Sequence, residues 1–196
     1  MSDSAAAGFR AAVFAAICWI ALGVDSILRP EPANYRDTLW IVPFLATISA
    51  FWHAHSVQAA GRRRSERYAF YAVMFASALV LVGMAGIIGQ AETLAALAFP
   101  GGALIWTVGL IWFGIATWRS GVFPVYVGVS LILLEPGSIF TGIALSPIAG
   151  LSDHGAYSAG LEKGAVMLLV ALGFREVVAS DHRVRYAHRE TVPLAR

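Results

Sequence analysis

The chain has 196 residues, of which 58% are hydrophobic and only 13% are charged, and its formal net charge is +2 at pH 7. A water-soluble domain carries roughly 25% charged residues, so these few charges could not cover a surface that faces water. The composition therefore argues against an ordinary soluble domain and predicts a protein embedded in a lipid bilayer.

Long apolar runs follow one another along the chain and predict six membrane-spanning helices. A helix needs about 20 apolar residues to cross a hydrocarbon core of about 30 Å, whereas a barrel strand needs only about ten in strict alternation. A helix also satisfies its own backbone hydrogen bonds, as lipid requires. The predicted spans are residues 9–28, 39–59, 69–88, 94–118, 122–143 and 157–178.

The predicted fold class is therefore all-α. We expect one bundle of six transmembrane helices over residues 1–179 and a basic cytoplasmic tail over residues 180–196. The first run is about 20 residues long and no A-x-A cleavage site follows it, so it is interpreted as a retained helix and not as a signal peptide.

The basic residues lie mainly on one side of the predicted spans. Three of the 14 Lys and Arg residues fall on one side, namely Arg29, Arg36 and Lys163. The other side holds the rest, which are Arg10, Arg62, Arg63, Arg64, Arg67, Arg119, Arg175, Arg183, Arg185, Arg189 and Arg196. Because cytoplasmic loops carry an excess of Lys and Arg, this asymmetry predicts that both termini face the cytoplasm of a bacterial cell and that the protein is multi-pass in its plasma membrane.

Glycines recur every three residues near the end of the third predicted span, at Gly83, Gly86 and Gly89. Small residues allow membrane helices to approach closely. Two interpretations remain open. The glycines pack against other helices of the same bundle, or they form the contact with a second copy or a partner membrane protein.

Ionisable residues inside the predicted spans are the candidate binding residues, because burying a charge in a membrane is costly and needs a reason. Four stand out: Asp25, Glu135, Lys163 and His53. At 1.5 Å of rise per residue, the first three lie at similar depth in the outer leaflet on different helices. We therefore expect Asp25, Glu135 and Lys163 to form one buried polar cluster. His53 lies toward the cytoplasmic side, where we expect a hydrogen bond within the bundle.

Glu135 directly precedes Pro136 and Gly137. A residue before proline avoids the α conformation, and proline removes a helical hydrogen bond, so the fifth span should kink or break here. An acid at such a break is suited to binding a ligand or a proton in a cavity. The alternative is a structural kink in which Lys163 or Ser138 satisfies the acid.

Motifs for other kinds of chemistry are missing from the sequence. It contains no H-E-x-x-H, no phosphate-binding glycine loop and no EF-hand. The Arg62–Arg63–Arg64 run is explained by membrane orientation. We therefore predict no catalytic residue, metal, cofactor or nucleic-acid partner, and membrane lipid as the surrounding partner.

Residues 113–124 read Phe-Gly-Ile-Ala-Thr-Trp-Arg-Ser-Gly-Val-Phe-Pro. This segment resembles a turn in small, uncharacterised six-span integral membrane proteins of bacteria, in which the fourth span ends in arginine, a small residue and glycine, and proline opens the fifth. Here these are Arg119, Ser120, Gly121 and Pro124, while Val125 stands where a basic residue is usual. The resemblance implies a six-span fold and a membrane location, but no activity.

The leading functional expectation is binding or passage of a small solute or proton through an outward-facing polar cavity lined by Asp25, Glu135 and Lys163. The second is a structural or accessory membrane subunit in which the charges hold helices together. The third is a membrane enzyme that acts on a lipid.

Overall fold

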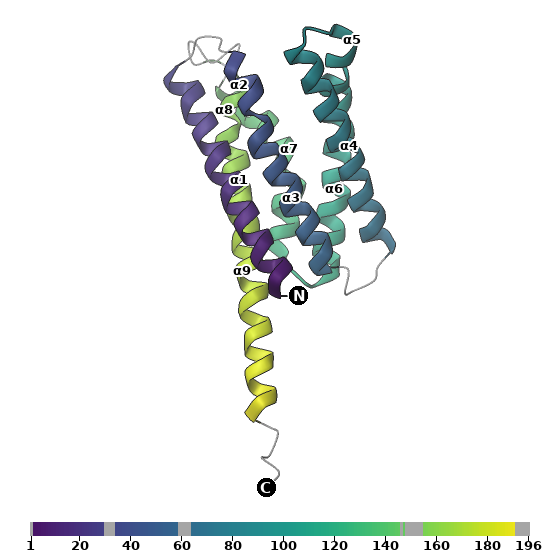
Figure 1. The fold of residues 1–196 in the computed structure, drawn as a ribbon, viewed down its shortest axis with the longest axis vertical. Coiled ribbons are helices and arrows are strands. Elements are labelled where there is room, and N and C mark those ends of the chain that lie inside the picture. Colours follow the sequence, from purple (N-terminus) through teal and green to yellow (C-terminus); the bar gives the residue numbers. More distant parts are fainter. Residues whose placement is uncertain (1, 30–33, 59–63, 146, 148–154, 191–196) are drawn as a thin grey trace.

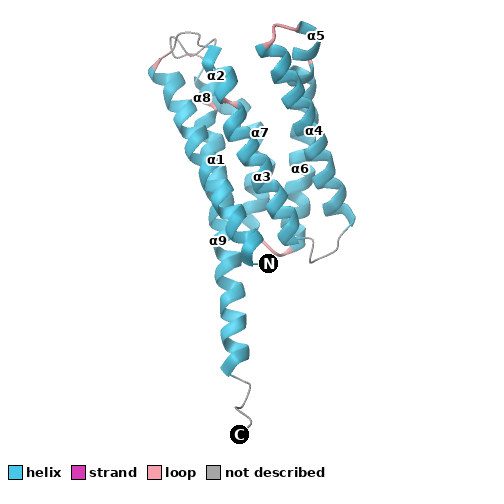
Figure 2. Ribbon diagram, in the orientation of Figure 1, coloured by secondary structure: helices cyan, strands magenta, loops and turns pink. Residues whose placement is uncertain are grey.

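The computed structural model describes residues 2–29, 34–58, 64–145, 147 and 155–190, and these residues form helices and short connections without a strand. The all-α fold class is confirmed (Figure 2). The long helices run along the bundle (Figure 1) and are α1 (Ser2–Leu28), α3 (Ile41–Gln58), α4 (Arg64–Ile88), α6 (Ala103–Ser120), α7 (Val125–Leu145) and α9 (Gly160–Glu190). The short elements are α2 (Asn34–Leu39), α5 (Glu92–Ala95), the π-helical η2 (Leu97–Gly102) and α8 (Gly155–Ser158).

Three of the described helices are long and apolar enough to cross a membrane by length and composition. They are α1 from Asp3 to Leu28, α4 and α7. The other predicted spans correspond to α3, to α6 with the irregular segment before it, and to the first part of α9.

The fourth predicted span, residues 94–118, is not one continuous α-helix. Its first part forms the end of α5 and the π-helical η2, and regular α-helix begins only at Ala103. Pro100, which cannot donate a backbone hydrogen bond, and the flexible pair Gly101–Gly102 explain the irregular geometry. The prediction of one continuous helix over residues 94–118 was wrong, because it was based on the overall hydrophobicity of the run and gave no weight to Pro100, Gly101 and Gly102.

The division at residue 180 does not coincide with the end of a helix. Helix α9 continues without interruption to Glu190, well past the last predicted span residue, and extends beyond the rest of the bundle (Figure 1). Residues 191–196 of the predicted tail lie outside the described residues, as do Arg62 and Arg63.

The close contacts between helices depend on small residues. Helix α1 packs against α9 and α3, α6 packs against α7 and α4, and α7 also contacts α9. Where α6 crosses α7, a Cβ atom on Gly114 would lie 2.6 Å from the carbonyl oxygen of Gly128. The two backbones can approach this closely only because both positions lack a side chain.

The glycines of α4 are covered by the chain itself. A Cβ on Gly83 would overlap the backbone of Ala98 in η2, and one on Gly86 would lie 2.5 Å from Cβ of Leu94 in α5. Packing within the bundle therefore accounts for Gly83 and Gly86. Gly89 is exposed, so a contact with a partner through this face stays a prediction.

Candidate functional site

Two of the four candidate residues meet in the interior of the bundle. Nζ of Lys163 on α9 lies 3.0 Å from Oε2 of Glu135 on α7. Both residues are buried, with exposed fractions of 8% for Lys163 and 6% for Glu135. The hydroxyl of Ser138 donates a hydrogen bond to the backbone oxygen of Glu135 at 2.9 Å and lies 3.4 Å from Oε2 of that residue. The predicted proximity of Glu135 and Lys163 is thus present in the structure.

The Lys163 ammonium also lies near two indole rings. Its Nζ is 5.2 Å from the ring centroid of Trp19 on α1 and 5.6 Å from that of Trp106 on α6. A cation at this distance from an aromatic ring is attracted by the negative face of the ring, most strongly for tryptophan. The positive charge of Lys163 is therefore stabilised by three other helices at once.

Each of these indoles also donates a hydrogen bond to a side chain on a further helix. Trp19 Nε1 donates to the hydroxyl of Thr47 on α3, and Trp106 Nε1 donates to the hydroxyl of Ser77 on α4, both at 3.0 Å. Both hydroxyls donate in turn to the backbone carbonyl four residues earlier on their own helix, at 2.8 Å. Every long helix of the bundle thus contributes one polar or aromatic side chain to a connected network around Lys163.

A second acid, Glu162, completes the site and was missed by the sequence analysis. Glu162 precedes Lys163 on α9 and interacts electrostatically with both Lys163 and Glu135. Its Oε2 atom is buried and has no hydrogen-bond partner among the described residues. The available signal was a second acid at the depth of Lys163. We call the group Trp19, Thr47, Ser77, Trp106, Glu135, Glu162 and Lys163 the central cluster.

The Pro136–Gly137 pair does not break the helix. Helix α7 continues through both residues to Leu145, so a complete break, one of the two predicted outcomes, is not present. Gly137 has a different role, because a Cβ atom there would lie 2.5 Å from Oε1 of Glu162. The missing side chain makes room for the second carboxylate beside the first.

Asp25 belongs to a separate network at the end of α1. It accepts hydrogen bonds from the Tyr35 hydroxyl at 2.5 Å and from Nε of Arg36 at 2.9 Å, and Nε of Arg29 lies 3.6 Å away. Arg36 is fully buried and also donates to the backbone oxygens of Asp25 and Arg29. Burial is the largest single influence on Arg36 and opposes its charged form, but the hydrogen bonds and charges of Asp25 and Tyr35 together outweigh burial and raise the pKa of Arg36.

The prediction of one cluster is therefore wrong for Asp25. Asp25 lies six residues beyond Trp19, about 9 Å farther along α1, where α2 supplies its partners. Similar depth in the membrane was not enough to predict that Asp25 joins the other two residues, because α2, a short helix between the spans, supplies partners for Asp25 at the end of the bundle.

His53 is half-buried on α3, and its side chain forms no hydrogen bond with another described residue. The neighbouring His55 is the histidine with a defined contact. Its Nδ1 lies 2.6 Å from Oε1 of the buried Glu66 on α4, and its ring stacks on Phe70 with centroids 4.0 Å apart. The hydrogen bond expected for His53 is therefore not present among the described residues, and His55 instead links α3 to α4.

Metal binding has no support in the part of the chain that the structure describes, where no group of three His, Cys, Asp or Glu side chains is close enough to hold an ion. Comparisons of the chain with family models, with curated proteins and with solved structures found no match.

Proposed function

We propose that this chain is a six-span protein of the bacterial plasma membrane, with both termini in the cytoplasm, that binds a proton at the central cluster for proton or solute passage. The observation that carries the proposal is that two carboxylates, Glu135 and Glu162, share the single ammonium of Lys163, and one carboxylate oxygen is buried without a partner.

Helix length and charge pairing support six spans. Helices α3 and α6 have 18 residues each, which corresponds to about 27 Å, close to the thickness of the hydrocarbon core. Helix α9 carries Lys163 inside its apolar part, but Glu135 of α7 neutralises that charge. A paired charge costs less to bury in a membrane than an isolated one, so α9 is able to cross beside α7.

The arrangement of the helices supports the orientation. Helix α1 begins, and α9 ends, toward the same end of the bundle (Figure 1). Arg10 lies in the first half of α1, Arg64 and Arg67 lie in the first turn of α4, and Arg119 lies in the last turn of α6; α4 begins and α6 ends at this end of the bundle (Figure 1). Arg29 follows the last residue of α1, and Arg36 belongs to α2 at the opposite end. The excess of positive charge at the first end supports the proposal that this end faces the cytoplasm.

Cysteine labelling tests this topology. In a Cys18→Ala background, Glu92→Cys at the start of α5 should react in intact cells with a maleimide that cannot cross membranes. Val125→Cys at the start of α7 should react only after the cells are permeabilised. Both positions are exposed, so access to the reagent depends on the side of the membrane. If Val125→Cys reacted in intact cells and Glu92→Cys reacted only after permeabilisation, the orientation would be the reverse of the one proposed. If both variants reacted in intact cells, the two positions would lie on the same side and the proposed topology would be excluded.

The charges of the central cluster favour a bound proton. If both carboxylates were ionised, the group of Glu135, Glu162 and Lys163 would carry a net negative charge in a poorly solvated place. A buried carboxylate without a partner is more stable when protonated. Glu135 already has the ammonium at 3.0 Å, so Glu162 is the group that takes the proton. Glu162 lies close to the start of α9 at the outer end of the bundle, which favours exchange with the outside.

Infrared spectroscopy of the protein in lipid nanodiscs tests the proton directly. The wild-type chain should show a protonated-carboxyl band that disappears as the pH is raised and that is lost in Glu162→Gln. The matched control is Glu92→Gln, because Glu92 is exposed at the same end and its loss should leave the band intact. A wild-type protein without such a band would contradict the proposal.

A second candidate function is that of a structural or accessory subunit, in which the central cluster only holds the helices together. It is favoured by the burial of Glu135 and Lys163 and by the short distance between them. Proteoliposomes with an internal pH dye separate the two functions. A proton-passing protein should dissipate a pH gradient faster than empty liposomes and lose this activity in Glu162→Gln, whereas a structural subunit should behave like empty liposomes.

A further inference from the structure

A second layer of buried polar side chains lies toward the end of the bundle where α3 ends, α4 begins and α6 ends (Figure 1). It consists of Gln58 on α3, Glu66 on α4 and Thr117 on α6, none more than 3% exposed. Each lies eleven residues along its helix from a member of the central cluster, namely Thr47, Ser77 and Trp106. Eleven residues are three helical turns, or about 16 Å, so both layers lie on the same inward face of each helix.

The acid of this second polar layer is bound to a histidine. Oε1 of Glu66 lies 2.6 Å from Nδ1 of His55, and the side chain of His55 is 19% exposed whereas that of Glu66 is 4% exposed. The His55 ring is held parallel to Phe70, and its Nε2 forms no hydrogen bond with a described residue. Histidine gains and loses a proton near neutral pH. His55 is therefore placed to connect the buried carboxylate with the solution at this end.

Gln58 adds a buried acceptor to the same layer. Its Nε2 donates a hydrogen bond to the Thr117 hydroxyl at 2.9 Å, while its Oε1 is buried without a partner among the described residues. The second polar layer thus resembles the central cluster, because each contains a buried acid and a buried oxygen without a partner.

The other ionisable side chains near this end leave the pair of Glu66 and His55 intact. Those on the helices that meet here are Asp3 and Arg10 of α1, His53 of α3, Arg64, Arg67, Tyr68 and Tyr71 of α4, and Arg119 of α6. All are exposed except the half-buried His53, and none forms an ion pair with Glu66. The Tyr71 ring lies 6.5 Å from that of His55. Among the described residues, His55 is therefore the group whose charge can balance the buried carboxylate.

Three phenylalanines separate the two polar layers. Phe51 of α3, Phe70 of α4 and Phe113 of α6 each lie between the two layers along their own helix and are at most 2% exposed. The Phe113 ring centroid is 5.8 Å from that of Phe51 and 6.2 Å from that of Phe70. We call these rings the aromatic layer. A charge is costly to place among packed hydrocarbon, so a proton does not cross this layer while the rings are closed.

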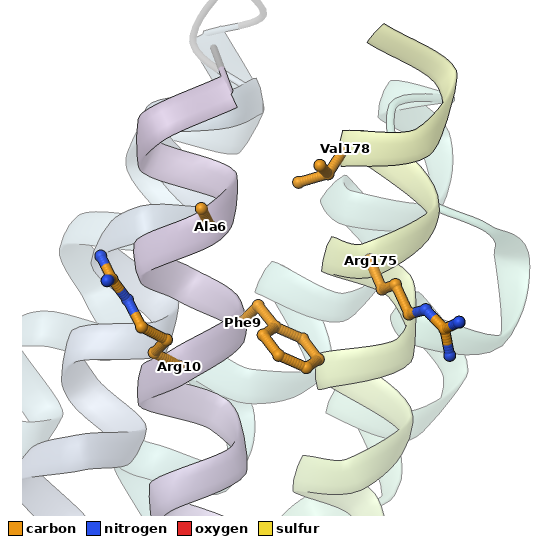
Figure 3. Close-up of a pocket in the computed structure, with 5 residues that line it drawn as sticks. All are labelled: Ala6, Phe9, Arg10, Arg175 and Val178. Atoms are coloured by element: carbon orange, nitrogen blue, oxygen red, sulfur yellow. The ribbon is translucent and has the colours of Figure 1, made fainter. Parts of the chain in front are cut away.

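The groove between α1 and α9 offers no alternative proton site at this end. It is lined by Ala6, Phe9, Arg10, Arg175 and Val178. Phe9 lies between the two helices, and both guanidinium groups are directed outward, away from the groove (Figure 3). The lining contains no acid or histidine, so it holds no group that accepts a proton near neutral pH.

We propose that His55 and Glu66 form a second proton-binding site, which exchanges protons with the solution at this end while the central cluster exchanges them with the opposite side. This inference rests on the proposed proton passage. In the loaded site both ring nitrogens of His55 carry a proton, and the Nδ1–H donates to the Glu66 carboxylate. In the empty site Nε2 has released its proton to the solution. The aromatic layer keeps the two sites apart, so a proton passes only when these rings move.

His55→Gln tests the second site in the proteoliposome assay. Glutamine is polar but cannot bind a proton, so the rate at which the pH gradient dissipates should fall roughly 100-fold or more, the typical contribution of a positioned proton-transfer group. The infrared band of the Glu162 carboxyl should remain, because the central cluster lies three turns away. The matched control is His53→Gln, which removes a histidine from the same helix that forms no hydrogen bond with another described residue, and it should keep the wild-type rate.

The outcomes separate this inference from the proposed function. Wild-type flux in His55→Gln would overturn the second site and leave the proton at Glu162 untouched. Loss of both the flux and the Glu162 band in that variant would also overturn it, because His55 would then act through the fold. Glu66→Gln keeps a hydrogen-bonding group beside His55 and removes its charge, so it should slow the flux too, and an unchanged rate would contradict the pair. A wild-type chain that passes no protons would instead refute the proposed proton passage, and the second site with it.

Discussion

Replacement of Lys163 by methionine should destabilise the protein by about 3–5 kcal/mol, because removing one partner of a buried ion pair leaves the other charge uncompensated. Glu135 is only 6% exposed and would lose the ammonium that lies 3.0 Å from its carboxylate. Glu162 cannot replace the lysine, because a carboxyl group supplies no positive charge whether or not it is protonated. Denaturant unfolding in detergent micelles, followed by tryptophan fluorescence, measures the difference.

The double variant Lys163→Met with Glu135→Gln is the informative comparison. It removes both charges, so most of the lost stability should return, and the two substitutions should be strongly non-additive. Arg175→Met, on the exposed face of the same helix, should change stability little. If Lys163→Met resembled Arg175→Met, the ion pair would contribute nothing to the fold, and the central cluster would not be a buried charged site.

Gly114→Ala should destabilise the protein by about 1–3 kcal/mol, although it adds only one methyl group, because the new atom would force two packed backbones apart. The added Cβ would lie 2.6 Å from the carbonyl oxygen of Gly128 and 2.9 Å from the backbone nitrogen of Ile132. Backbone atoms of a packed helix cannot move aside as a flexible side chain can. Thermal unfolding in the same detergent measures the effect.

Val108→Ala provides the control for this crossing. Val108 lies on the same helix and is 65% exposed, so its truncation should have a much smaller effect. Similar losses in Gly114→Ala and Val108→Ala would mean that α6 and α7 do not cross at these glycines.

Some features of the site could be predicted from the sequence. The cost of charge in lipid pointed to Glu135 and Lys163, and these residues form a buried ion pair between α7 and α9. The same reasoning placed Asp25 with them, but the buried Arg36 of α2 binds Asp25 at the end of α1 instead. Depth along a helix is readable from residue number, whereas the direction of a side chain around the bundle depends on how each helix is rotated against its neighbours.

The roles of Glu162 and of the two indoles also could not be predicted from the sequence. No sequence motif marks Glu162. Its carboxylate fits beside α7 only because Gly137 has no side chain there. Trp19 and Trp106 are 87 positions apart in the chain, and only the packing of α1 and α6 around α9 brings both rings within 6 Å of the Lys163 ammonium.

The sequence by itself determined the all-helical class, because apolar runs of this length and so few charges are compatible with little else in a bilayer. The tertiary structure alone decided which polar groups meet and where the π-helical η2 interrupts an apolar run. The physical reason is that hydrophobicity and helix length are local properties of the chain. The partners of a buried charge are set by helix rotation and by close backbone contacts such as that of Gly114 with Gly128, which no local pattern records.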